Sequence, residues 1–327
     1  FLSSVISSLI PVDIKHIQLV AFFVLPMVFF MLHYESLRGL KRIAEFSFFY
    51  RMSQATFTIG SLFIISNFIK HDNVPIYAYL TSLCVVSLLA YVTYRYWFVS
   101  KATFVPDEDI NYFRTSNMLK ISIPLMLAQS VQFVMAWTDQ IMLGNMLDAE
   151  SVAIYGVAFR FSMGVTITLM AINSIASPKF AEKYIKRDII GVGKIAIQSA
   201  KLIFWTTLPL AMILLIFPKF FLGIYGAEFL IGVEVLRWLI VGRVINALCG
   251  SVGNLMQMTG QQKYFMNILI IGSVINVLLN YFLIPIYFIK GAAIASFVSL
   301  SFWNLAMILV VKKKFGFLPC YIPFIKR

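Results

Sequence analysis

The sequence predicts an all-α integral membrane protein, built as a two-lobed helical bundle. Three observations predict this fold class. The 327 residues are 60% hydrophobic and only 13% charged, whereas soluble domains carry about 25% charged residues. The apolar residues form runs long enough to cross a bilayer, and most basic residues fall in alternate connections between those runs. A polar stretch at residues 99–116 divides the runs into two groups.

Each long apolar run predicts one transmembrane helix, because a bilayer core requires about 20 apolar residues per helix. Nine such runs follow one another along the chain. They fall at about 15–34, 44–69, 76–98, 117–143, 151–176, 195–217, 230–257, 264–286 and 291–312. Because the chain begins with Phe1, we expect residues 1–12 to be the tail of an earlier span.

The polar stretch 99–116 contains FVPDEDINYF, with three spans before it and six after. This position predicts a linker between two helical bundles. The acidic run Asp107-Glu108-Asp109 also has the D-x-D pattern by which many glycosyltransferases hold a metal and a sugar nucleotide. No globular domain surrounds it, so a solvated acidic linker is the better interpretation.

The basic residues predict the orientation in the membrane. One set of alternate connections holds 18 of the 27 lysines and arginines, the opposite set holds 4, and the rest lie inside spans. Short loops rich in Lys and Arg stay on the cytoplasmic side. We therefore expect a cytoplasmic C-terminus, and the net charge of +13 then reflects topology rather than nucleic-acid binding.

Polar residues inside the run 230–257 predict a helix with one polar face. Arg243, Gly250, Asn254 and Gln257 fall on one stripe at helical spacing, and apolar residues cover much of the rest. A charge at mid-bilayer costs about 2.5–3.5 kcal/mol on insertion scales, so it normally faces a cavity or a partner. We expect Arg243 to line a hydrated cavity.

Other spans repeat this pattern and suggest a shared cavity. Arg160 lies inside the run 151–176, and Gln132 shares a helical face with Asp139 in the run 117–143. Arg51 lies near the cytoplasmic end of its run and could instead reach the headgroups. Asp139 could form an ion pair with Arg160 or hold a coupling cation. The stripe of Asn276 and Asn280 is more typical of helix–helix contacts than of a ligand site.

The sequence contains no motif that is typical of an enzyme active site. The three histidines are scattered, and the three cysteines form neither a CxxC pair nor a Cys/His cluster. GSVG at 250–253 lacks the preceding strand and the lysine of a phosphate-binding loop. We expect no enzyme activity, no metal site and no cofactor.

Several stretches resemble the Wzx-type polysaccharide flippases of the multidrug/oligosaccharidyl-lipid/polysaccharide exporter superfamily. The stretches are LGIYGAEF, MQMTGQQKY, INVLLNYFLIPIYFIKGAAIA, TDQIMLGNMLDAESVAIYGVAFRF and LHYESLRGLKRI. The resemblance implies about twelve helices in two lobes, of which about nine are present. Residues 1–98 would then be the remainder of the first lobe, with the end of span three and spans four to six. Residues 99–116 would be the cytoplasmic linker, 117–313 the second lobe with spans seven to twelve, and 314–327 a cytoplasmic tail.

The resemblance also implies a function, namely moving undecaprenyl-diphosphate-linked oligosaccharide across the bacterial cytoplasmic membrane by alternating access. Arg160 and Arg243 would then bind the diphosphate, and Gln132, Asn254 and Gln257 would bind sugar hydroxyls. Arg51 would add to the cavity, and Asp139 would couple transport to H⁺ or Na⁺. Other glycan-assembly proteins, such as a polymerase, are expected partners.

Three alternatives stay open at this point. A multidrug or cation antiporter of the same superfamily would favour acidic cavity residues, whereas the intramembrane charges here are mostly arginine. A membrane enzyme of glycan assembly would be expected to carry a large external loop, and the sequence predicts only short outer connections. A scaffold without transport activity is the third alternative.

Overall fold

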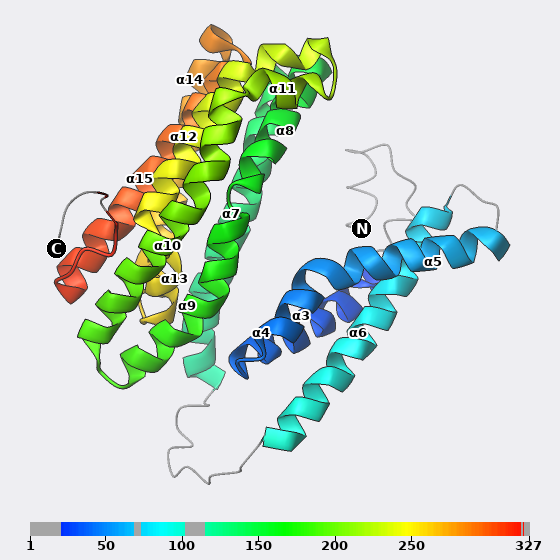
Figure 1. Cartoon of the computed structure of the whole chain (residues 1–327), viewed down its shortest axis with the longest axis vertical. Coiled ribbons are helices and arrows are strands. Elements are labelled where there is room, and N and C mark those ends of the chain that lie inside the picture. Colours follow the sequence, from blue (N-terminus) through cyan, green and yellow to red (C-terminus); the bar gives the residue numbers. More distant parts are fainter. Residues whose placement is uncertain (1–20, 69–72, 102–114, 322, 324–327) are drawn as a thin grey trace. The chain divides into compact units, whose positions relative to one another are not determined.

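The computed structural model describes residues 21–68, 73–101, 115–321 and 323, and these are almost entirely helical (Figure 1). The chain divides into two compact units, Phe1–Asp107 and Glu108–Arg327. The acidic run 107–109 and most of the expected linker lie outside the described residues.

The first unit packs its helices around an aromatic core. Its elements are α3 (Val24–Gly39), α4 (Ile43–Ser47), the π-helical turn η1 (Phe48–Ser53), α5 (Gln54–Phe68) and α6 (Val74–Lys101). Phe30, Tyr34 and Phe49 are buried together with Leu83 and Ala90 of α6. Helix α6 therefore packs against both α3 and α5.

The second unit forms a longer bundle of helices. Its elements are α7 (Thr115–Met146), α8 (Ala149–Gly164), α9 (Ile167–Ile185), α10 (Ile189–Ile216), α11 (Pro218–Gly223), the 3₁₀ turn η3 (Ala227–Gly232), α12 (Val233–Cys249), α13 (Val252–Met258), α14 (Gln262–Tyr287) and α15 (Ile289–Phe315). Local sequence sets two of the starts. The Asp148 side chain accepts the Ser151 N–H before α8, and Asp188 accepts the Gly191 N–H before α10.

Two apolar clusters stabilise this bundle, and polar side chains lie between them. Along α7, Ala128 belongs to one cluster and Leu143 to the other. Along α12, Ile240 and Cys249 are divided in the same way. The segments between these positions carry Gln132 and Asp139 on α7 and Arg243 and Asn246 on α12, so a polar layer lies between the two apolar clusters.

The fold class predicted from the sequence is confirmed, but not every span is a straight helix. Within the described residues, five helices are long and apolar enough to cross a membrane, namely α6, α7, α10, α14 and α15. Helices α8 and α9 are bent by 45° between Gly164 and Ile167 and together make a sixth. The expected run 44–69 is instead divided into α4, η1 and α5. Residues 15–20 of the first expected run lie outside the described part of the chain.

The run 230–257 is not the single helix that its apolar composition predicts. Helix α12 ends at Cys249, Gly250 has φ +65° and ψ −140°, and α13 begins at Val252. The break lies against α10, because a Cβ at Gly250 would come within 2.5 Å of the Ala200 Cβ. The Leu248 carbonyl, released by the helix end, accepts the Tyr321 N–H at 3.0 Å. Glycine is required here because this backbone conformation is strained for other residues.

Candidate functional site

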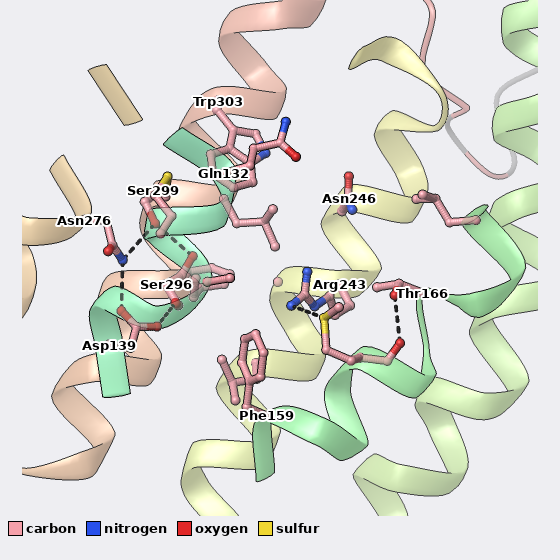
Figure 2. Close-up of a pocket in the computed structure, with 18 of the residues that line it drawn as sticks. Gln132, Asp139, Phe159, Thr166, Arg243, Asn246, Asn276, Ser296, Ser299 and Trp303 are labelled. Carbon is pink, nitrogen blue, oxygen red and sulfur yellow. Dashed lines mark hydrogen bonds between the residues drawn. The ribbon is translucent and has the colours of Figure 1, made fainter. Parts of the chain in front are cut away.

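The polar layer of the second unit surrounds a cavity of about 310 Å³. Helices α7, α8, α9, α12, α14 and α15 supply its walls (Figure 2). Its polar lining residues are Gln132, Asp139, Thr166, Arg243, Asn246, Asn276, Ser296 and Ser299. We call this space the arginine cavity. It brings together side chains from both ends of the unit's sequence.

Arg243 contributes the positive charge of the arginine cavity. Its guanidinium donates a hydrogen bond to Met163 Sδ at 3.1 Å and lies 5.7 Å from the centre of the Phe159 ring. Within the described residues, no carboxylate lies in ion-pair distance of this side chain. A guanidinium has five N–H donors, so most of them are left for water or for a ligand.

Asp139 contributes the negative charge, and protein donors surround it. The carboxylate is 3% exposed and accepts hydrogen bonds from Tyr155 Oη and from Ser296 Oγ. Asn280 Nδ2 donates to it at 2.7 Å and Asn276 Nδ2 at 3.3 Å. Figure 2 shows Asn276 and Ser296 directed at this carboxylate. Four donors from three helices therefore stabilise a buried charge.

A second cavity of about 180 Å³ adjoins the first. It shares Gln132, Leu169, Asn246 and Trp303 with the arginine cavity. Its further polar lining residues are Asn173, Ser251, Asn254, Gln257 and Asn304. We call this space the amide cavity. No charged side chain is found among the described residues that line it.

The sequence-predicted site residues fall into three groups. Gln132, Asp139 and Arg243 line the arginine cavity together. Asn254 and Gln257 line the amide cavity with Gln132, although the break at Gly250 separates them from the helix of Arg243. The expected single stripe on one helix is therefore wrong, and two helices supply it.

Arg160 and Arg51 lie elsewhere. Arg160 is exposed on α8 and lines neither the arginine cavity nor the amide cavity. Asp139 forms no ion pair with it, so the alternative of a structural Asp139–Arg160 pair is wrong. Arg51 is exposed in η1 of the first unit, 5.9 Å from the Tyr50 ring centre. The binding roles of Arg160 and Arg51 stay predictions.

Sequence reasoning missed the hydroxyl groups of the site. Tyr155, Ser296 and Ser299 were not among the expected residues, and Ser299 receives a hydrogen bond from Asn276 at 3.4 Å. The asparagine stripe joins helices as expected, because Asn276 and Asn280 of α14 donate to the buried carboxylate of Asp139 on α7. The spacing of Ser296, Ser299 and Trp303 on one helical face was the available pattern.

Two protein-family models match the sequence. Residues 5–183, more than half of the chain, match the family described as "Polysaccharide biosynthesis protein". Residues 124–282 match the family MatE.

One curated relative is a probable low-salt glycan biosynthesis flippase, Agl15, from Haloferax volcanii. It is 25% identical over 167 residues, which are 51% of this chain and 35% of that protein. The match thus spans about a third of the relative's length.

Two solved structures have a similar fold. One is a transporter of the MOP superfamily from Pyrococcus furiosus, with a TM-score of 0.76 and 16% identity over 96% of this chain and 73% of that one. The other is MATE in the bent conformation, with a TM-score of 0.79 and 16% identity over 96% of this chain and 72% of that one. At this identity the likeness shows the fold alone, which is that of a multi-pass membrane transporter.

Proposed function

The chain belongs to the polysaccharide biosynthesis protein family, and from that premise we propose that the full-length protein flips undecaprenyl-diphosphate-linked oligosaccharide across the cytoplasmic membrane. It would be a Wzx-type flippase of a bacterial inner membrane, with its C-terminus in the cytoplasm. The similarity to a probable glycan biosynthesis flippase supports this proposal. A charged, hydroxyl-rich headgroup cannot cross hydrocarbon unaided, so the protein has to offer it polar partners inside the membrane.

The observation that carries the proposal is the unpaired guanidinium of Arg243 in a cavity between helices. The other charge of that cavity, Asp139, already accepts four hydrogen bonds. Among the described residues, Arg243 has only a sulfur acceptor and an aromatic ring as partners. The arginine cavity is therefore suited to bind an anion with several acceptor oxygens. A diphosphate fits this demand because guanidinium groups bind phosphate through paired, charge-assisted hydrogen bonds.

Asp139 is our candidate for coupling transport to H⁺ or Na⁺. Its carboxylate connects α7, α8, α14 and α15 through the donors described above. The buried Asn280 Oδ1 has no partner within the described residues and lies on the side chain that donates to Asp139. A small cation would be held by such carboxylate and amide oxygens, and a proton would neutralise the carboxylate directly. Either change would alter the contacts among four helices.

The alternative is a multidrug or cation antiporter, and Asp139 is the observation that favours it. An exporter of cationic drugs would present a carboxylate to its substrate. Here the carboxylate is 3% exposed and bonded on both oxygens, whereas the cationic Arg243 is the group with unused donors. This difference favours an anionic substrate. Drug resistance without any effect on surface glycan would favour the antiporter instead.

Complementation of a flippase-null strain with the full-length protein tests the proposal. Charge-assisted hydrogen bonds contribute about 1.5–3 kcal/mol, so we expect Arg243→Ala to reduce glycan display about 10- to 100-fold. Arg243→Lys keeps the charge but not the fork geometry, and we expect partial display. Lipid-linked oligosaccharide should accumulate in the alanine variant, as measured by extraction and mass spectrometry.

Arg237→Ala is the matched control. Arg237 lies on the same helix, but it is exposed and bonded to Glu234 at 2.9 Å. We expect wild-type display from this variant. Normal display from Arg243→Ala at wild-type protein levels would contradict the proposal. The same assay on Arg160→Ala tests the sequence-based prediction for that residue.

A further inference from the structure

The amide cavity is unusual in how many of its polar groups have no protein partner. Within the part of the chain that the structure describes, the side-chain amides of Gln132, Asn246, Asn254 and Gln257 make no hydrogen bond to protein. Ser251, which is 4% exposed, has an Oγ without a partner. These groups come from three helices and from the break between α12 and α13, so they do not share one local cause.

Buried polar groups without partners are rare in folded proteins, because each costs about 1–3 kcal/mol. Two groups of this cavity meet that condition, Ser251 Oγ and Asn173 Oδ1, whereas the four amides are half-buried and line its open space. Side-chain amides offer both N–H donors and C=O acceptors, and a serine hydroxyl offers both as well. A ligand that satisfies them must itself carry groups that donate and accept. Hydroxyl and acetamido groups have this property, whereas phosphates accept only.

The cavity also has an apolar surface suited to a ring. Trp303 lines it beside Gln132, and both residues also line the arginine cavity (Figure 2). Asn246 lies three residues beyond Arg243 on α12, an axial rise of about 4.5 Å. A ligand whose diphosphate contacts Arg243 would therefore place its next group at the amide cavity.

We propose that the amide cavity is a subsite for an uncharged, hydroxyl-bearing sugar ring, the one attached to the diphosphate, and that it discriminates against sugars carrying a carboxylate. This rests on the proposed function for the diphosphate end of the substrate. A carboxylate in this cavity meets no cation, because none of the described residues that line it is charged. It would lose its hydration without gaining an ion pair. A neutral ring keeps the favourable hydrogen bonds and loses little.

Binding to the purified full-length protein in nanodiscs tests the proposal with three probes. They are undecaprenyl diphosphate, the same lipid carrying one N-acetylhexosamine, and the same lipid carrying one hexuronic acid. Two hydrogen bonds between the sugar and the amide cavity would change the affinity about tenfold. We expect the N-acetylhexosamine probe to bind about tenfold more tightly than undecaprenyl diphosphate, and the hexuronic acid probe to bind no more tightly than undecaprenyl diphosphate.

Substitutions separate this inference from the proposed function. Asn254→Leu combined with Gln257→Leu should abolish the tenfold advantage of the N-acetylhexosamine probe and leave the affinity for undecaprenyl diphosphate unchanged. Arg243→Ala should weaken all three probes by a similar factor. If Arg243→Ala leaves the affinity for undecaprenyl diphosphate unchanged, the proposed function fails.

Three results would overturn the subsite itself. Equal affinity for the probes with and without N-acetylhexosamine would mean that the amide cavity holds water only. Retention of the sugar advantage in the double leucine variant would place the sugar elsewhere. Tighter binding of the hexuronic acid probe than of the N-acetylhexosamine probe would contradict the discrimination by charge. Thermal unfolding of each variant shows whether a lost affinity comes from misfolding.

Discussion

Replacing Gly250 with alanine should destabilise the second unit strongly, because the break between helices α12 and α13 depends on this residue. Gly250 has φ +65° and ψ −140°, a conformation that side chains with a Cβ rarely adopt. An added Cβ would lie 2.5 Å from the Ala200 Cβ and 2.7 Å from the Ala200 Cα. These contacts are with the helix backbone of α10 and its first side-chain atom, so no flexible side chain can turn away.

The expected magnitude follows from two independent costs. A residue forced into a sparsely populated backbone region costs about 1–3 kcal/mol. Overpacking a filled helix contact costs about 1–3 kcal/mol more. We expect the free energy of unfolding to fall by about 4 kcal/mol, which is a large part of the roughly 5–15 kcal/mol that stabilises a domain. For a unit of this size, that loss lowers the Tm by about 8–16 °C.

Thermal unfolding of the full-length protein in detergent measures this loss. Gly156→Ala is the control, because Gly156 lies inside α8 and a Cβ there meets nothing within 4 Å. Its Tm should stay the same or rise slightly, since alanine is the better helix former. Adding Ala200→Gly to Gly250→Ala should recover part of the loss. Equal Tm values for Gly250→Ala and Gly156→Ala would refute the claim that the break requires glycine.

Two further predictions concern carboxylates. Asp139→Leu should lower the free energy of unfolding by about 4 kcal/mol, because it leaves Tyr155, Asn280 and other donors without an acceptor. Asp139→Asn keeps an acceptor oxygen and should cost less. Chemical denaturation measures both losses, and equal losses would contradict this prediction. Outside the spans, the hydrogen bond from Lys183 holds the pKa of Asp188 below its usual range. The stabilisation from Asp188 is therefore present above the unfolded pKa of about 3.9 and is lost as the pH falls through the lower folded pKa. Asp188→Asn should reduce the fall in Tm between pH 5 and the acid range, and an unchanged acid dependence would argue against the pairing.

Helices with continuous apolar composition could be predicted from the sequence, because hydrophobicity alone defines them. Helices α14 and α15 contain the runs 264–286 and 291–312 with a few more residues at each end, and α10 covers the run 195–217 up to Ile216 and begins six residues earlier. Their ends could not be placed more closely, since helix ends depend on caps such as Asp188 rather than on hydropathy.

The breaks in the spans could not be predicted in the same way. Gly250 lies in an apolar run, and glycine is common in transmembrane helices without ending them. Only the contact with Ala200 of α10 shows why the chain changes direction there. The 45° bend between α8 and α9 likewise has no proline at its break, since Val165 and Thr166 occupy it. The break at Gly250 depends on packing against α10, which the local sequence does not reveal.

The candidate site was predictable where a charge or an amide had to be explained in an apolar run. Arg243, Asp139 and Gln132 met this condition, and they line one cavity. Arg160 met it equally, yet it is exposed, because helical spacing fixes which residues share a face but not what that face contacts. Hydroxyl residues such as Ser299 could not be predicted as site residues. A serine hydroxyl can donate a hydrogen bond to the backbone carbonyl four residues earlier and is therefore tolerated in any span.

The identity of the charged residues therefore says less about the substrate than their unused hydrogen-bonding capacity does. The arginine cavity holds one positive and one negative side chain, and from composition alone it could take either sign of ligand. Protein donors fill both oxygens of Asp139, whereas Arg243 keeps most of its donors. What remains to be satisfied is a set of donors at Arg243 and a mixed set of donors and acceptors around Asn254 and Gln257. An acceptor-rich diphosphate followed by a hydroxyl-rich neutral ring matches these two demands in the order in which the two cavities adjoin.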